Sequence, residues 1–193
     1  MKKSITVATG QNDNDHHAEL WVLFIEGDAS AFNILYSFYY QMLYNFGKRF
    51  LDSTEVEDCI HDTFLNILKY KNSAKNVSNV KAYLFKCLRN QIYKFKKTTL
   101  LEFDLIEGTI PYEEDDQDKE LLLKQLKKII KKLSPREREI IYLKYFQGFN
   151  NIEISELLDI NYQTVRNILV NAIKKLRVLG EEFIELLFLL FSK

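Results

Sequence analysis

The chain has 193 residues, enough for one large or two small helical domains, each with a modest core. It contains only six glycines and two prolines, and this scarcity of turn residues argues against a β-sandwich and favours helices joined by short loops. Its 27 basic side chains balance its 27 acidic ones, so net charge alone indicates no nucleic-acid partner. Composition therefore predicts an all-α protein, and the partners have to be inferred from where the charges lie.

The beginning of the chain is expected to be a flexible tail, residues 1–15, because it is polar and shows no periodicity. The first helix signal comes from apolar residues at helical spacing between Phe32 and Phe46. Asp28 precedes this run and can accept a hydrogen bond from a free backbone amide, as an N-cap does. These features predict a long amphipathic helix.

A second helix is predicted to begin at a capping box formed by Thr54 and Glu57, and its outer face is acidic. A polar loop, residues 71–80, separates it from a further helix at residues 81–97. The side chains of that further helix expected to point inward are Leu84, Leu88, Ile92 and Phe95. Together these elements predict a first helical domain, residues 16–97.

Charge is segregated along the chain. Residues 69–97 carry nine basic side chains and no acidic one, whereas residues 98–118 carry eight acidic side chains and no basic one. From Lys124 onward the charge turns basic again. This pattern predicts two domains with basic faces, joined by an acidic flexible linker that covers residues 98–118.

The second domain, residues 119–178, contains the most clearly marked helix start of the chain. Residues 121–133 are predicted to be helical, and residues 134–137 then combine a serine N-cap, a proline at the first helical position and a glutamate that completes a capping box. A short helix at residues 153–158, a tight turn and a longer helix from Asn161 follow. This order is the layout of a helix-turn-helix, whose second helix enters the major groove of DNA.

The longer helix has an apolar stripe and a polar face that suits DNA. The stripe consists of Val165, Leu169, Ala172 and Leu176. On the polar face, amides can pair with adenine, a guanidinium with guanine, and valine or threonine can contact the thymine methyl group. The residues expected to contact DNA are Gln163, Thr164, Arg166, Asn167, Val170, Asn171 and Lys174. The alternative is an amphipathic helix whose polar face is only solvated.

Two sets of segments, one in the first predicted domain and one in the second, together resemble the extracytoplasmic-function (ECF) sigma factors of the sigma-70 family. In the second domain they are residues 133–139 (LSPRERE), 145–148 (YFQG), 154–158 (ISELL), 164–167 (TVRN) and 172–177 (AIKKLR). These alone are similar to the output domain of LuxR-type regulators as well, so a non-sigma helix-turn-helix regulator is the alternative function. Residues 55–69 and 81–90 favour the sigma factor, because a LuxR-type protein would need a receiver or ligand-binding domain with strands.

The resemblance implies a protein that binds core RNA polymerase and directs it to promoters, with sigma domain 2 at residues 16–97 and sigma domain 4 at residues 119–178. The helix after Thr54 matches the family's polymerase-docking helix. The residues at the matching positions are Glu57, Asp58, Asp62 and Phe64. An acidic rim around an aromatic anchor suits such an interface. A solvated acidic face is the alternative.

The resemblance also implies that the loop and the helix after it recognise the −10 element as melted single-stranded DNA, while the second domain binds the −35 element as duplex. The residues that match the −10 surface are Lys75, Asn76, Ser78, Asn79, Tyr83, Lys86, Arg89, Asn90 and Lys94. Aromatic stacking together with basic residues along the backbone is what capture of a single strand needs. Tyr83 is equally compatible with a place in the core.

Two features depart from the family pattern. Residues 168–171 (ILVN) stand where many relatives carry basic side chains, so we expect weak −35 binding, with recruitment aided by another DNA-bound protein or with apolar contacts to a T-rich element. The apolar C-terminal tail, residues 179–193, is too short to span a bilayer. Packing against the second domain, binding of an anti-sigma factor or another partner, and membrane contact are its possible roles.

No catalytic constellation is visible. His16 and His17 lie in a polar segment, and the cluster of Asp58, His61 and Asp62 could at most bind a metal weakly. We therefore expect no enzyme activity, no cofactor, no metal and no small-molecule substrate. The two cysteines lie in apolar helical patterns and the chain starts without a signal peptide, which predicts reduced thiols and a cytoplasmic protein.

Overall fold

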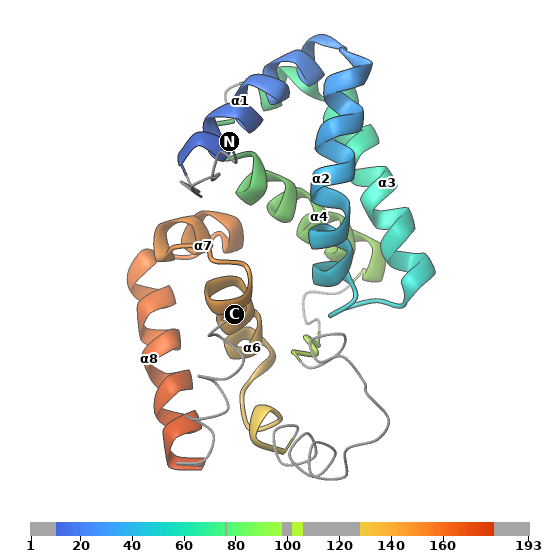
Figure 1. Ribbon diagram of the computed structural model, residues 1–193. Coiled ribbons are helices and arrows are strands. Elements are labelled where there is room, and N and C mark those ends of the chain that lie inside the picture. The colour runs from blue at the N-terminus through green and yellow to red at the C-terminus, as the bar shows by residue number, and fades with distance from the viewer. Residues whose placement is uncertain (1–10, 76, 98–101, 106–127, 180–193) are drawn as a thin grey trace, which may run out of the picture.

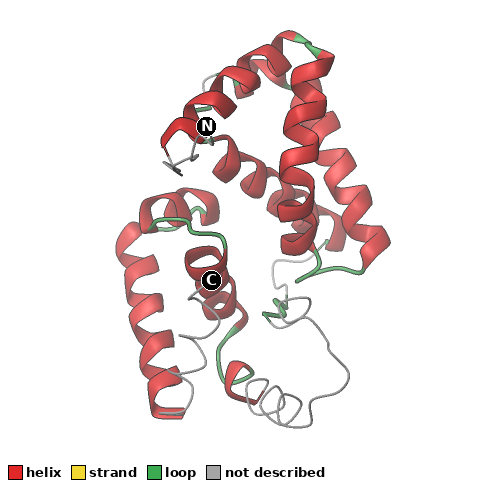
Figure 2. Cartoon of the chain, in the orientation of Figure 1, coloured by secondary structure: helices red, strands yellow, loops and turns green. Residues whose placement is uncertain are grey.

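The computed structural model describes residues 11–75, 77–97, 102–105 and 128–179 (Figure 1). Every regular element in these ranges is a helix, and Figure 2 draws no strand among them. The all-α prediction is confirmed. The helices form two groups, one before and one after the undescribed stretch at residues 106–127.

The first group comprises α1 (Gln11–Glu26), α2 (Ala29–Gly47), α3 (Ser53–Lys69), the 3-10 turn η1 (Lys71–Ala74) and α4 (Val80–Lys96). Asp28 caps α2 as predicted, because its carboxylate accepts a hydrogen bond from the Ala31 amide at 2.8 Å. Gly27 ends α1 with a φ of 106°, a backbone angle that glycine adopts far more readily than other residues. The chain can therefore turn tightly from α1 into α2.

The predicted start of α3 was wrong by two residues. Its N-cap is Asp52, and the capping box pairs Asp52 with Glu55 rather than Thr54 with Glu57. The Glu55 amide donates to Asp52 at 3.0 Å, and the Asp52 amide donates to Glu55 at 3.2 Å. Glu57 is therefore free of a capping role and lies exposed on the first turns of the helix.

Helix α1 was not predicted. It begins at Gln11, so the last five residues of the expected tail are helical, whereas residues 1–10 lie outside the described part of the chain. The inward side chains of α1 include Leu20, Phe24 and Ile25. Trp21 is fully buried, and its indole nitrogen donates to the Ala74 carbonyl oxygen at 2.8 Å. This bond ties the 3-10 turn to α1.

The second group comprises α6 (Pro135–Ile141), the π-helical turn η2 (Tyr142–Phe146), α7 (Asn151–Leu158) and α8 (Tyr162–Leu179). The predicted capping box of Ser134 and Glu137 is present at the start of α6, with proline at the first helical position. Asn150 and Glu153 form a second box at the start of α7. Residues 128–130 are helical, and the earlier part of the helix predicted there lies outside the described residues.

The helix-turn-helix is formed by α7 and α8. Asp159 ends α7 in the left-handed conformation, with a φ of 50°, and Asn161 accepts a hydrogen bond from the Gln163 amide at 2.7 Å at the start of α8. The four residues predicted for the apolar stripe of α8 are all buried, namely Val165, Leu169, Ala172 and Leu176. They pack α8 against α6 and α7.

The two groups of helices share one apolar core. The Tyr142 ring of η2 is only 2% exposed and lies 6.1 Å from the Phe46 ring of α2, measured between centroids. Phe149, which precedes α7, lies 5.2 Å from Phe85 of α4 in an edge-to-face contact. The second group therefore packs on the first through aromatic side chains of both.

Residues 102–105 of the acidic linker pack into the same core. Phe103 and Leu105 are buried, and the Phe103 ring lies 5.0 Å from Phe50 and 5.5 Å from Tyr142. The buried guanidinium of Arg49 donates to the Leu105 carbonyl oxygen at 2.8 Å. This short part of the linker is thus anchored, while its remainder lies outside the described residues.

Phe95 does not point inward, contrary to the prediction for α4. Leu84, Leu88 and Ile92 are fully buried as expected, but Phe95 is 44% exposed. It lies in the last turn of α4, which ends at Lys96, where less of the molecule remains to cover it.

Gly47 gives a first prediction, on stability. A methyl group at Gly47 would lie 2.7 Å from a methyl carbon of Val56, which is fully buried and stiff because it is β-branched. We expect Gly47→Ala to lower the free energy of unfolding by about 1–2 kcal/mol, since overpacking outweighs the better helix propensity of alanine. Denaturant unfolding measures this. In a Val56→Ala background the same substitution should no longer destabilise, and an equal loss there would contradict the steric explanation.

Candidate nucleic-acid and protein interfaces

The polar face of α8 is open. All seven residues predicted to contact duplex DNA are exposed, on the side opposite the buried stripe. Gln163 donates its amide hydrogen to the Asn167 side chain at 3.0 Å, so these two amides are already oriented along one face. Figure 1 shows α8 along the outer edge of the second group, on the side away from α2 and α3.

Lys175 has a structural contact that sequence reasoning missed. Its ammonium group donates to both carboxylate oxygens of Glu137, at 2.7 and 2.9 Å, and so joins α8 to the start of α6. Burial alone would raise the pKa of Glu137, but the hydrogen bonds from Lys175 and Ser134 lower it below its ordinary value. Glu137 therefore stays ionised, and the pair holds the angle at which α8 is presented.

The acidic face of α3 is exposed, but its predicted aromatic anchor is not. Glu57, Asp58 and Asp62 all face solvent, and Asp62 accepts a hydrogen bond from Gln91 of α4 at 2.8 Å. Phe64 is only 3% exposed, and its ring contacts Tyr36 at 5.0 Å. Further ring contacts join Phe64 to Phe24 and Phe32.

The prediction that Phe64 touches a partner is thus wrong for this conformation. Its spacing from Ile60 places it on the inward stripe of α3, where it fills the core. The apolar side chain that does accompany the acids at the surface is Leu65, which is 59% exposed.

Tyrosines of α2 border the acidic face, which sequence reasoning did not anticipate. Tyr36 and Tyr40 are half-buried, and the Tyr36 ring lies 6.2 Å from the His61 ring. Burial raises the pKa of both tyrosines, and the nearby carboxylate of Glu57 raises it further. Their hydroxyl groups therefore remain protonated and can donate hydrogen bonds beside the acids.

The residues predicted for the −10 surface divide into two classes. Four are exposed, namely Lys75, Ser78, Asn90 and Lys94. Four are half-buried, namely Asn79, Tyr83, Lys86 and Arg89. Asn76 lies outside the described residues. All eight described members belong to α4 or to the loop before it, so they lie in one continuous segment of the chain.

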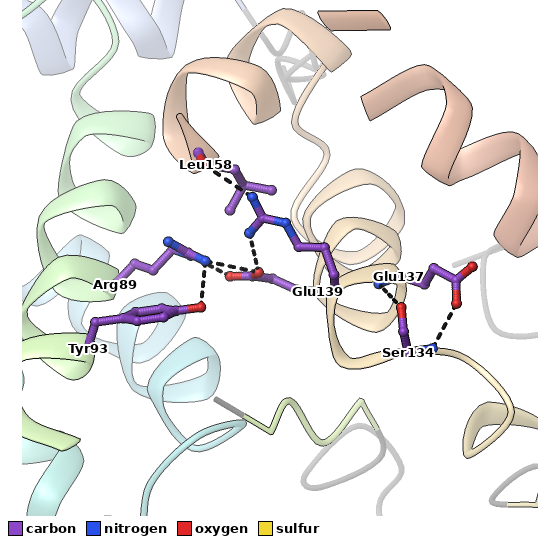
Figure 3. Close-up of polar contacts among 7 residues, drawn as sticks. Arg89, Tyr93, Ser134, Glu137, Glu139 and Leu158 are labelled. Carbon is purple, nitrogen blue, oxygen red and sulfur yellow. Dashed lines mark hydrogen bonds and ion pairs between the residues drawn. The ribbon is translucent and has the colours of Figure 1, made fainter. Parts of the chain in front are cut away.

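Three of the half-buried residues bind the second group of helices. The Asn79 side chain donates to Glu153 at 2.6 Å, and the Lys86 ammonium group donates to Asp159 at 2.5 Å. Arg89 donates to Glu139 at 2.6 Å (Figure 3). These bonds were not predicted.

Tyr83 lies at the edge of the core. Its ring is half-buried and meets the Trp21 ring edge to face at 5.5 Å. Burial, with a smaller contribution from the neighbouring Cys87, raises the pKa of Tyr83 to about 12. The ring is therefore packed rather than presented as an open platform for a base.

Two further findings concern the described residues alone. No group of three histidine, cysteine, aspartate or glutamate side chains among them lies close enough to hold a metal ion. In the same part of the chain, no helix has both the length and the apolar character needed to cross a membrane.

Family models match both groups of helices. Residues 35–99 match sigma-70 region 2, and residues 123–176 match sigma-70 region 4. The region 2 match covers α3, the loop after it and α4, whereas the region 4 match covers the helix-turn-helix. The match to region 2, in addition to region 4, favours a sigma factor over a regulator that contains only a helix-turn-helix.

Relatives and solved structures agree with these matches. An uncharacterized protein of Clostridium acetobutylicum is 28% identical over 163 residues, which are 78% of this chain and 88% of that protein. The RNA polymerase sigma factor SigZ of Bacillus subtilis is 27% identical over 133 residues, which are 67% of this chain and 75% of SigZ.

Among solved structures, CnrH in complex with the cytosolic domain of CnrY has a TM-score of 0.60 and 20% identity, and covers 84% of this chain and 96% of CnrH. The sigma factor RpoE of Bartonella quintana, in complex with the anti-sigma factor NepR, has a TM-score of 0.56 and 22% identity. That match covers 77% of this chain and 95% of RpoE. Regions 2 and 4 in one helical chain of this fold show that it belongs to the sigma-70 family, as an ECF sigma factor that directs transcription initiation.

Proposed function

We propose that three separate surfaces of this sigma factor perform its three tasks. The acidic face of α3, with Glu57, Asp58 and Asp62, binds core RNA polymerase. The loop before α4 and the basic face of α4 bind the −10 element as single-stranded DNA. The polar face of α8 reads the −35 duplex. The observation that supports this division best is that the seven proposed reading residues of α8 are exposed on one side of a helix-turn-helix.

Physical chemistry supports each assignment. The carboxylates of α3 are complementary to a basic partner, and the adjoining tyrosines add apolar area and hydrogen-bond donors. On α4, Lys86, Arg89 and Lys94 line one helix and can follow a phosphate backbone.

We assign residues 16–97 to domain 2 and residues 119–178 to domain 4. The protein is proposed to act in the cytoplasm, without catalytic activity of its own.

Run-off transcription tests the proposed function. Purified core polymerase, the full chain and a library of random promoters are combined, and the transcripts are sequenced. We expect initiation that depends on the chain and selects common −10 and −35 sequences. Stable binding to duplex DNA without any initiation would overturn the proposal.

Arg166 gives a prediction for the −35 element. It is exposed on α8, and an arginine pair with guanine contributes about 1–3 kcal/mol of discrimination. We expect Arg166→Ala to lower initiation at the selected promoters by about tenfold and to relax base preference at one position of the −35 element. Lys132→Ala removes the same charge from an exposed site outside α8 and serves as the control. Equal losses in both variants would mean that Arg166 contributes only charge.

We also propose that another DNA-bound protein assists recruitment. Of the seven proposed reading residues only Arg166 and Lys174 are cationic, so few counterions are released on binding. The affinity of the full chain for −35 duplex should therefore fall with salt at a logarithmic slope of about −2. Nanomolar, sequence-selective duplex binding by the chain alone would contradict the need for a helper.

An anti-sigma factor is a further proposed partner. Its support is that RpoE, which has the same fold, was solved with the anti-sigma factor NepR. Co-purification of the full chain with a candidate anti-sigma factor, and inhibition of run-off transcription by that protein, would test this partner.

A further inference from the structure

A cavity of about 600 Å³ lies beside residues 102–104 of the linker. Its other walls come from the junction of α2 and α3 (residues 48–52 and 55), from Lys96 at the end of α4, and from Lys131 and Arg138 of the second group. Binding sites for small molecules have volumes of about 300–1,000 Å³ and often lie at such junctions. The surfaces proposed above for polymerase and DNA include none of these residues.

The second group supplies two cations to the cavity that are not bound elsewhere in the described chain. The Arg138 side chain has no hydrogen bond or ion pair to a described residue, and its Nε atom is buried. Lys131 is exposed and likewise pairs with no described side chain. From the end of α2, Lys48 lines the same cavity and donates to Ser53 at 3.2 Å. Because a buried N–H group without an acceptor is unfavourable, this wall suits an anion.

The cavity is lined by carboxylates as well as cations. Glu55 accepts from Lys96 at 3.2 Å, and Asp52 accepts from the Glu55 amide at 3.0 Å as the N-cap of α3. Glu102 and Asp104 of the linker are exposed. These acids would repel a ligand that is anionic along its whole length, such as a nucleic-acid strand. They can instead accept hydrogen bonds from the amino or hydroxyl groups of a small ligand with one anionic end.

Phe50 adds a half-buried aromatic ring to the cavity. Its ring meets Phe46 edge to face at 5.2 Å and Phe103 at 5.0 Å, so packing on two sides fixes its orientation. A planar heterocycle can stack on an aromatic ring that is held in this way. Cations, an aromatic ring and hydrogen-bond acceptors are the groups that bind the phosphates, the base and the ribose of a nucleotide. A bare phosphate ion would leave most of the cavity unfilled.

We propose that this cavity is a binding site for a nucleoside phosphate. Its phosphates bind Arg138, Lys131 and Lys48, its base packs on Phe50, and Glu102 accepts hydrogen bonds from the base or ribose. This site goes beyond the proposed function, because it lies outside the three surfaces assigned to polymerase and DNA. A ligand that binds the folded chain alone also stabilises it by mass action. The nucleotide is therefore a candidate regulator of this sigma factor.

Isothermal titration calorimetry of the full chain with ADP, GDP, CDP and UDP tests the site. We expect at least one of these nucleotides to bind. Its parent nucleoside and inorganic phosphate should each bind at least tenfold more weakly, because each makes only part of the contacts. Absence of binding by all four nucleotides would overturn the proposal. Binding of inorganic phosphate as tight as that of the nucleotide would overturn it as well, since the base would then contribute nothing.

Lys131→Ala and Lys132→Ala form a matched pair, because both lysines are exposed and only Lys131 lines the cavity. We expect Lys131→Ala to weaken nucleotide binding about tenfold, as the loss of one charged hydrogen bond does. Lys132→Ala should stay within about twofold of the unmodified chain. Lys131→Arg keeps the charge and should retain most of the affinity. Equal losses in the two alanine variants would show that the nucleotide senses only overall charge, and this would overturn the site.

Discussion

Replacing Asp58 and Asp62 with lysine is expected to lower the affinity of the chain for core RNA polymerase about a hundredfold or more. The two carboxylates lie one helical turn apart on the exposed face of α3 and are proposed to meet a basic partner. Reversal places like charges opposite one another, which is unfavourable by several kcal/mol, and each factor of ten corresponds to about 1.4 kcal/mol. Fluorescence anisotropy with labelled sigma factor and purified core polymerase measures the change.

The matched control reverses Glu19 and Glu26, two exposed acids on α1. It changes the net charge of the chain by the same amount and should leave polymerase affinity within about twofold. A similar loss in both variants would show that polymerase senses overall charge and not the face of α3. Unchanged affinity in the Asp58 and Asp62 variant would contradict the proposed docking surface.

Tyr142→Ala is expected to lower the free energy of unfolding by about 3–5 kcal/mol, as large aromatic truncations in cores do. The Tyr142 ring is 2% exposed and contacts Phe46, Phe103 and the Arg49 guanidinium, the last at 4.8 Å from the ring centre. Its loss would leave a cavity where the linker and both groups of helices meet. Denaturant unfolding of the full chain measures the loss.

Two variants calibrate this prediction. Tyr142→Phe keeps the ring but removes the acceptor of the Gln147 side-chain hydrogen bond, so a loss of about 1 kcal/mol is expected. Tyr145→Ala truncates a tyrosine that is 43% exposed and should lower the free energy of unfolding by clearly less than Tyr142→Ala, by about 1 kcal/mol. A loss in Tyr142→Ala as small as that of Tyr145→Ala would contradict the burial of the ring.

Local signals in the sequence predicted most of the second domain. The capping box of Ser134 and Glu137 and the stripe from Val165 to Leu176 both depend on residues a few positions apart, so helical geometry alone determines them. The exposed face of α8 follows from the stripe on its opposite side. This is why all seven proposed reading residues were found on the surface.

Other features depended on contacts that no local pattern reveals. Helix α1 begins in a polar segment, and its fully buried Trp21 bonds to Ala74, which is 53 positions away in the sequence. Arg89 and Glu139 are 50 positions apart, so segregated charge predicted a basic surface but not the acid that covers part of it. The position of Phe64 in the sequence is compatible both with the inward stripe of α3 and with the polymerase-binding surface of the family. Only its packing against α2 shows that the ring is buried.

Trp21 is the only tryptophan of the chain, and it serves as an intrinsic fluorophore. Its indole donates a hydrogen bond to Ala74, next to the loop proposed to bind the −10 strand, and its ring contacts the Tyr83 ring. Indole emission depends on these immediate neighbours. Entry of a DNA strand into the loop can therefore be followed by the wavelength and intensity of emission from the unlabelled protein, on the time scale of promoter melting itself.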